Sequence, residues 1–315
     1  MMYFLISHQK QLQRVCNNEF KVLFSRENPS EIKFYDKKIL QMDVGKTGKI
    51  GYLKIDLKHD LQKNKTIITH QKSQVPLFIQ KALYYDETIP SMAHLFILSP
   101  SGGILQGDRY RTDITLTSNA ISHITTQGAT RIYKMDSNYA TQIINLNVGE
   151  NSYLEFIPEQ LIPYKNSRYY QKINLNVDKS STLVYSEIIV PGRVAMGELF
   201  DYDICYLKSS GRDGNQILFN DSCILEPKKH EITIPSILGN NTILATVYII
   251  TNKENTENLK DKINSDFQTN DELKGGFSVL PNDSGMCVRI LGNSSEEIRT
   301  TIYNIAKIVR SEVLV

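Results

Sequence analysis

Hydrophobic and polar residues alternate in three successive stretches between residues 100 and 198. Each stretch contains two short alternating runs joined by turn-forming residues, such as Asp178-Lys179 in the third stretch. Alternation with a period of two predicts β-strands that bury one face. The first apolar positions, Ile114, Ile144 and Ile173, recur at intervals of about 30 residues, a length typical of stacked structural repeats. We therefore expect three strand pairs stacked on one another, with the segments that follow them along one side.

The C-terminal region follows a different pattern. Ile298, Ile302 and Ile305 recur at helical spacing behind Ser294 and Glu297, which form the sequence of a capping box. This pattern predicts a helix over residues 295–312. The fold class that we expect is mainly β, with a β-helical body of stacked sheets and a small α-containing C-terminal part.

These patterns divide the chain into three parts. Residues 1–47 are polar and mixed, and we interpret them as an N-terminal arm or extra strands. Residues 48–250 consist almost entirely of strand and turn patterns, which predicts a β-helical core domain. Residues 251–315 are expected to form a helical or mixed cap.

Composition narrows the possible partners and compartments. The 36 Lys and Arg residues nearly balance the 34 Asp and Glu residues, so nothing indicates a nucleic-acid partner. The opening residues MMYFLIS lack the features of a secretory signal, and no apolar run reaches transmembrane length. The four cysteines are widely scattered, which argues against a zinc site or a disulfide framework. We expect a protein of the reducing cytoplasm without a membrane association.

Two segments rich in small and hydroxyl residues do not match common catalytic motifs. The loop that contains Gly102, Gly103, Gly107 and Asp108 lacks the Gly-Lys-Ser/Thr ending of a phosphate-binding loop. A tight turn in which Asp108 caps backbone amides is the simpler interpretation. The hydroxyls that begin at Thr125 have no suitably placed histidine partner, so a nucleophilic triad is poorly supported.

Carboxylates follow the second and third strand pairs. Glu155 and Glu187 occupy similar positions in their repeats, and stacking is expected to bring them to the same rim. Such a pair is able to hydrolyse a glycosidic bond or to hold a cation through oxygen ligands. Glu198 and Arg193 are alternatively able to form a simple ion pair. The chain has no tryptophan, which weighs against sugar stacking, so a β-solenoid carbohydrate-active enzyme remains the alternative.

Read in order, several motifs resemble the UreD family of urease accessory proteins, also called UreH. The motifs are GKIGYL at 48–53, SPSGGILQGD at 99–108, TTQGATRIYK at 125–134, LEFIPEQLIPY at 154–164, GRVAMGELF at 192–200 and VRILG at 288–292 with its following helix. The motif positions that we treat as binding candidates are Gly102, Gly103, Gly107, Thr125, Thr126, Gln127, Pro158, Pro163, Gly192, Arg193 and Gly197.

The resemblance implies a scaffold without enzymatic activity. Together with the accessory protein UreF and the GTPase UreG, such a scaffold docks on the structural subunits of apo-urease and lets nickel(II) reach the active site. It implies no permanently bound cofactor, only nickel in transit. Asp108, Glu155, Glu187 and Glu198 are the candidate ligands of this path, because oxygen ligands hold nickel weakly enough for exchange. A purely structural adaptor without an ion path is a further alternative.

Overall fold

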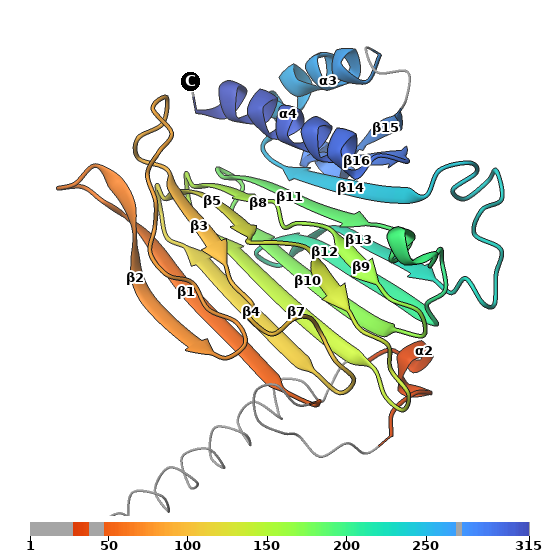
Figure 1. Ribbon diagram of the computed structural model, residues 1–315. Coiled ribbons are helices and arrows are strands. Elements are labelled where there is room, and N and C mark those ends of the chain that lie inside the picture. Colours follow the sequence, from red (N-terminus) through yellow and green to blue (C-terminus); the bar gives the residue numbers. More distant parts are fainter. Residues whose placement is uncertain (1–27, 38–46, 269–272, 315) are drawn as a thin grey trace, which may run out of the picture.

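The computed structural model describes residues 28–37, 47–268 and 273–314 of the 315-residue chain. Two stacked β-sheets and a layer of helices form this part of the molecule (Figure 1). Most of the predicted N-terminal arm lies outside the described residues, but the short helix α2 (Ser30–Lys33) packs near the first sheet. No helix in the described ranges is long and apolar enough to cross a membrane.

The first sheet has seven strands in the order β13-β12-β10-β7-β4-β1-β2. Its central strands run parallel, and an antiparallel strand closes each edge. Its strands are β1 (Ile50–Asp60), β2 (Lys65–Gln74), β4 (Arg109–Leu116), β7 (Ala140–Val148), β10 (Arg168–Val177), β12 (Ile204–Asp213) and β13 (Gln216–Leu225).

The second sheet has nine strands, and its main path runs β15-β16-β14-β11-β8-β5-β3. The short strands β6 and β9 lie off this path, where β9 pairs with both β6 and β11. Its strands are β3 (Ala93–Ile97), β5 (Ile121–Thr126), β6 (Thr130–Ile132), β8 (Tyr153–Phe156), β9 (Leu161–Pro163), β11 (Thr182–Ile189), β14 (Ile243–Ile250), β15 (Lys274–Val279) and β16 (Gly285–Gly292).

The chain winds between the two sheets as a β-solenoid. In each coil a strand of the first sheet leads through a tight turn, such as residues 117–120, into a strand of the second sheet. A longer segment, such as residues 127–139, then returns to the first sheet one position further along. All tight turns of the central coils therefore lie at one end of the strands, and all long segments lie at the other. The predicted stacking of three strand pairs is confirmed.

The register of the first coil differs from the predicted one. Ile114 of β4 pairs with Leu146 of β7, rather than with Ile144. Leu146 in turn pairs with Leu175 of β10, as the repeat pattern indicated. A shift of two residues leaves every side chain on the same face of its strand. The apolar alternation of β4 and β7 is therefore the same in both registers, and the sequence pattern does not distinguish them.

Both faces of the second sheet are buried at its central strands. One hydrophobic cluster fills the space between the sheets and includes Leu146 and Leu183. A second cluster lies on the opposite face and joins Val184 to Ile298 and Ile302 of the C-terminal helix. Consequently every residue of β11 is buried, although β-strands with one open face bury only alternate residues.

The C-terminal helix is the predicted one. Helix α4 (Ser295–Val313) begins after Ser294, whose hydroxyl accepts a hydrogen bond from the amide of Glu297, and it buries the predicted apolar stripe. Helix α3 (Lys253–Gln268) packs beside it. Figure 1 shows both helices over β14 and β16, on the side away from the first sheet. Residues 251–315 contain strands as well as helices, because β15 and β16 extend the second sheet. The division of this segment from the core at residue 250 remains a prediction.

A buried ion pair anchors α4 to the second sheet. Glu155 of β8 accepts hydrogen bonds from Arg310 Nε (2.8 Å) and Nη2 (2.7 Å), from the Tyr153 hydroxyl (2.7 Å), and contacts His123 Nδ1 at 2.6 Å. Arg310 also pairs with Asp86 at 2.9 Å. Burial alone raises the pKa of Glu155, but hydrogen bonds from His123 and Arg310 outweigh it and lower the pKa to about 2.

We predict that Arg310→Met lowers the free energy of unfolding at pH 7 by about 3–5 kcal/mol, because it leaves a buried carboxylate without its main partner. The folded-state pKa of Glu155 lies below its ordinary value of 4.5, so the stabilisation is complete above about pH 4.5 and is lost as the pH falls toward 2. Urea unfolding of the variant and of the unaltered protein, at pH 7 and at a pH near 2, measures the effect.

Arg299→Met is the matched control, because Arg299 lies on the same helix and pairs with Glu159 at 3.3 Å with about half of its side chain exposed. We expect its effect to stay below about 1 kcal/mol. Equal losses in the two variants would show that the buried ion pair does not anchor the helix.

Candidate functional site

A cavity of about 470 Å³ lies between the two sheets at the end with the long segments. Its mouth is lined by three segments from successive coils, residues 99–104, residues 126–131 and Pro158-Glu159. All three belong to the motifs identified in the sequence. The solenoid therefore gathers distant motifs around one opening.

Main-chain hydrogen bonds hold these segments together. The amide of Ile104 donates to the carbonyl of Arg131, and Tyr133 donates back to Ile104. Strand β6 then pairs with β9, and β9 with β11, so the segments form a small extension of the second sheet. Gly103 is required here because a Cβ at this position would lie 2.4 Å from the Tyr133 ring and 2.6 Å from the Arg131 carbonyl.

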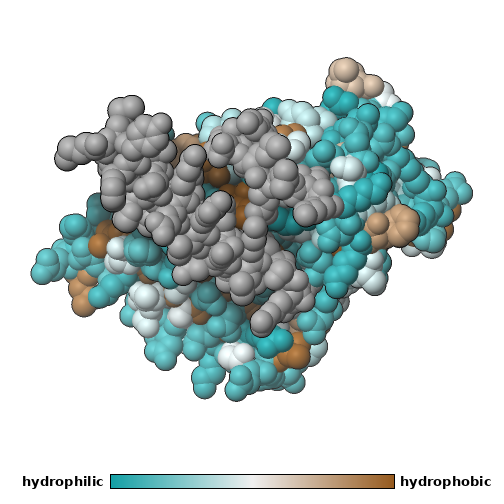
Figure 2. Space-filling model, turned by 90° about the horizontal axis from the view of Figure 1, so that it is seen from below, coloured by the Kyte–Doolittle hydropathy of each residue, from teal (hydrophilic) through white to brown (hydrophobic). Residues whose placement is uncertain are grey.

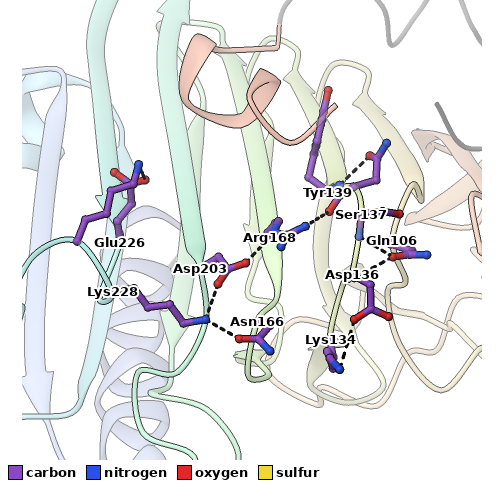
Figure 3. A network of polar contacts seen from close by, with 12 residues as sticks. Gln106, Lys134, Asp136, Ser137, Tyr139, Asn166, Arg168, Asp203, Glu226 and Lys228 are labelled. Atoms are coloured by element: carbon purple, nitrogen blue, oxygen red, sulfur yellow. Dashed lines mark hydrogen bonds and ion pairs between the residues drawn. The ribbon is translucent and has the colours of Figure 1, made fainter. Parts of the chain in front are cut away.

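Side-chain contacts also connect the coils at this end (Figure 3). Gln106 accepts a hydrogen bond from the amide of Asp136 in the next coil at 3.0 Å. Arg168 forms an ion pair with Asp203 at 2.7 Å one coil further, and Lys228 also pairs with Asp203. These contacts fix neighbouring coils relative to one another at this end of the solenoid.

A row of polar side chains extends from the cavity into the space between the sheets. Gln142 and Gln171 pair in register on β7 and β10, and the Tyr169 hydroxyl lies 2.7 Å from Gln142 Oε1 and 3.1 Å from Gln171 Oε1. Gln171 Nε2 donates to Glu187 Oε2 at 3.3 Å, and the Tyr185 hydroxyl donates to the same oxygen at 2.9 Å. The row thus ends on a buried carboxyl group.

Glu187 titrates near neutral pH. Burial raises its pKa to about 7, and the charge of Asp221 contributes in the same direction, while hydrogen bonds from Tyr185 and Gln171 oppose the increase. At pH 7 the group therefore exchanges readily between its neutral and charged forms. A cation that reaches Glu187 is able to replace the proton, which makes binding reversible and dependent on pH.

Three of the four cysteines lie at the hydrophobic cluster between the sheets, although they are far apart in the sequence. Cys205, Cys223 and Cys287 pack in or against the cluster between the sheets, and the charge of Glu187 acts on the pKa of each. Burial raises the pKa of Cys223 and Cys287 to about 11, and that of Cys205 further. The thiols therefore remain protonated near neutral pH. Within the described ranges no group of three or more His, Cys, Asp or Glu residues is arranged to hold a metal ion.

The expected common rim for Glu155 and Glu187 is wrong. Both residues lie inside strands, and Glu155 pairs with Val184 rather than with Glu187. Because Glu187 is three positions from Val184, alternation places it on the opposite face of the sheet. Glu155 points to α4, and Glu187 points to the first sheet. These two residues therefore do not form the carboxylate pair that glycoside hydrolysis needs.

Asp108 and Glu198 lie outside the cavity lining. Asp108 is buried and pairs with Lys49 Nζ at 2.9 Å, and it accepts hydrogen bonds from two backbone amides. Glu198 forms the ion pair with Arg193 that the sequence left open, and this hydrogen bond lowers the pKa of Glu198. Gly192 has a φ of 140°, and a Cβ there would lie 2.9 Å from the Glu198 carbonyl. Both carboxylates thus hold loops in place.

The remaining motif positions divide into two groups. Gly102, Gly103, Thr126, Gln127 and Pro158 line the cavity. Gly107, Thr125, Pro163, Gly192, Arg193 and Gly197 do not belong to its lining.

Sequence reasoning missed Gln142, Gln171 and Tyr185, which line the cavity more deeply. One signal in the sequence was able to reveal them. Gln142 and Gln171 lie one repeat apart, at positions where the strand alternation predicts apolar core residues.

Comparison with known proteins gives one consistent result. Residues 49–315 match the family described as UreD urease accessory protein. A protein from Cenarchaeum symbiosum named urease accessory protein UreD is 41% identical over 87% of this chain and 95% of its own length. Relatives from Brucella canis (35% identical, covering 90% of this chain and 94% of the relative) and Yersinia pseudotuberculosis (34%, 91% and 90%) have similar names.

We predict that Glu187→Gln changes how stability depends on pH. Between its ordinary pKa of 4.5 and its folded-state pKa of about 7, only the unfolded state releases the proton, so the stability of the unaltered protein falls as the pH rises through this window. The variant lacks this loss. Relative to the unaltered protein, it should gain about 3 kcal/mol between pH 4 and pH 8, as measured by urea unfolding.

The control is Glu231→Gln, which neutralises an exposed carboxylate. Its stability relative to the unaltered protein should change little across the same pH range. A constant difference between Glu187→Gln and the unaltered protein at all pH values would contradict the raised pKa.

Proposed function

The chain belongs to the UreD family of urease accessory proteins, and from this membership we propose that it acts in urease maturation as a scaffold without catalytic activity. The match over residues 49–315 carries the proposal, and the names of the relatives agree with it. We further propose that the scaffold works with UreF and UreG on the structural subunits of apo-urease and helps nickel(II) reach the urease active site. In this proposal nickel is a passing cargo and no cofactor is bound permanently.

The polar interior supports the proposed passage of an ion. The cavity mouth leads to amide and hydroxyl oxygens of Gln142, Gln171 and Tyr185 and then to Glu187. Oxygen ligands bind nickel less tightly than thiolate or imidazole does, and weak binding at several positions favours passage over capture. We therefore propose that Glu187, rather than Asp108, Glu155 or Glu198, is the carboxylate that contacts the ion.

Protonation of neighbouring groups favours release of the ion. A pKa of about 7 means that protons compete with a cation for Glu187 near neutral pH. Burial keeps the nearby thiols protonated, because it raises the pKa of Cys223 and Cys287 to about 11. Since a thiol must lose its proton to become a strong ligand, these cysteines hold nickel only weakly. Among the described residues, Glu187 is thus the exchangeable anionic position that we propose for the passing ion.

The proposal predicts the nickel content of urease made together with UreF, UreG and this chain. Without the chain, urease should assemble but contain little nickel. With Glu187→Gln the accessory complex should still form, while the nickel content at limiting nickel should fall severalfold, because the interior loses its exchangeable charge. Metal analysis of purified urease and co-purification of the accessory proteins measure the two effects.

Ser186→Ala is the matched control. Ser186 is buried on the same strand, but it pairs with Val247 and faces α4 instead of the cavity. Its variant should leave nickel content unchanged. Full loading of urease in the absence of the chain would refute the maturation role. Full loading with Glu187→Gln would refute the ion path and favour a purely structural adaptor.

A further inference from the structure

The outer face of the first sheet carries more positive charge than the composition suggests. This face lies opposite the core and contains a groove of about 750 Å³. Among the described residues that line the groove are four cations, Lys54, Arg111, Lys172 and Arg212, and one carboxylate, Asp113. The whole chain has a formal charge of only +2, so the fold concentrates cations here. Figure 2 shows the molecule from below, where most of the coloured surface is hydrophilic.

The strand register places two of these cations, Arg111 and Lys172, close to Lys208, which lies beside the groove lining. Arg111 and Lys172 both pair with Ile143, one from each side, and Lys172 pairs directly with Lys208. Neighbouring strands lie about 4.8 Å apart, so the three side chains form a row across the sheet. Burial lowers the pKa of Lys172, and the charges of Lys208 and Arg212 lower it further. The positive charges of these side chains add to one another and attract an anion that approaches Lys208 and Arg212.

Within the described ranges, some cations of this face have carboxylate partners and others do not. Arg111 is neutralised by Asp113, whose oxygens lie 2.9 Å from its Nε, and Lys54 has a looser partner in Asp56 at 3.6 Å. Lys208 and Arg212 form no ion pair with any residue in the described part of the chain. The positive charges of Lys208 and Arg212 on β12 are therefore not compensated by the described residues.

A ladder of amides adds hydrogen-bond donors beside the cations. Asn174 Nδ2 donates to Asn145 Oδ1 at 2.7 Å, and Asn145 Nδ2 donates to Asp113. Ser210 Oγ donates to Asn174 Oδ1 at 3.3 Å. Each asparagine oxygen thus accepts a bond within the ladder, while each NH₂ group has two N–H donors and uses one of them there. The surface consequently offers donors to a ligand that supplies acceptors.

We propose that this groove binds an acidic peptide segment of a partner protein in an extended conformation. Side chains on one side of an extended chain recur about every 6.6–6.8 Å, so alternate Asp or Glu residues are able to reach the cations and the amide ladder. The main chain supplies further acceptors. This inference is independent of the nickel path and goes beyond the proposed role in urease maturation.

The aromatic residues of the groove favour a peptide over single-stranded nucleic acid. Proteins that bind single-stranded nucleic acid without sequence preference usually stack its bases on exposed aromatic rings. The two tyrosines in the lining are buried, and the Tyr52 hydroxyl bonds to Asp113. Tyr170 packs in the cluster with Ile32 of α2 and Tyr206. These rings are occupied by the protein itself, so charge and hydrogen bonding remain as the means of recognition.

Binding of a fluorescein-labelled polyglutamate peptide to the full-length protein tests the proposal, with a polyglutamine peptide and a DNA oligonucleotide of equal length as comparison probes. We expect polyglutamate to bind in a salt-dependent way. The double variant Lys208→Glu/Arg212→Glu should weaken binding by about tenfold, because each reversal replaces an attraction with a repulsion of similar size. Lys208→Gln/Arg212→Gln should weaken it by a smaller factor.

The control variant Lys274→Glu/Lys307→Glu changes the net charge equally through exposed residues of β15 and α4. It should leave peptide binding nearly unchanged. The proposal is overturned if polyglutamate does not bind, if the control weakens binding as much as the groove variants do, or if DNA binds more tightly through the same two residues. Thermal unfolding of each variant verifies that it is folded, and the glutamine variant provides the test if the charge reversal does not fold.

Discussion

Parallel stacking of coils in register is the constraint on which the rest of the molecule depends. Because Leu146 lies over Leu175 and the second strands of the coils follow the same order, each long segment emerges at the same end as its neighbours. Motifs far apart in the sequence thereby become adjacent without any direct sequence signal. The same register determines which side chains enter the space between the sheets, which face α4, and which form the outer row of cations.

On the second sheet, the face on which a residue lies determines its surroundings and its pKa more than its chemical type does. Glu155 and Glu187 are both buried glutamates on neighbouring strands. Glu155 meets the Arg310 guanidinium and has a pKa of about 2, whereas Glu187 meets neutral donors and has a pKa of about 7. The first carboxylate is a permanent charge that anchors a helix. The second exchanges its proton and suits reversible contact with a cation.

Much of the fold was predictable because its signals are local. The capping box at Ser294, the apolar stripe of α4 and the alternation in the strand pairs each depend on neighbours within one element. The candidate site was less predictable. Asp108 and Glu198 were sensible ion ligands from their type and position, but Lys49 and Arg193 engage them. Those partners are visible only after loops from different coils come together.

The sequence by itself determined the elements, the repeat and the family resemblance, since period-two and helical spacing together with ordered motifs are properties of the chain. Tertiary structure decided which residues share a space. It placed Gln142, Gln171 and Glu187 in one polar row, brought three dispersed cysteines near it, and gathered cations on a face of a nearly neutral chain. The reason is physical: alternation assigns a residue to one of two faces, but only strand register and packing decide what each face meets.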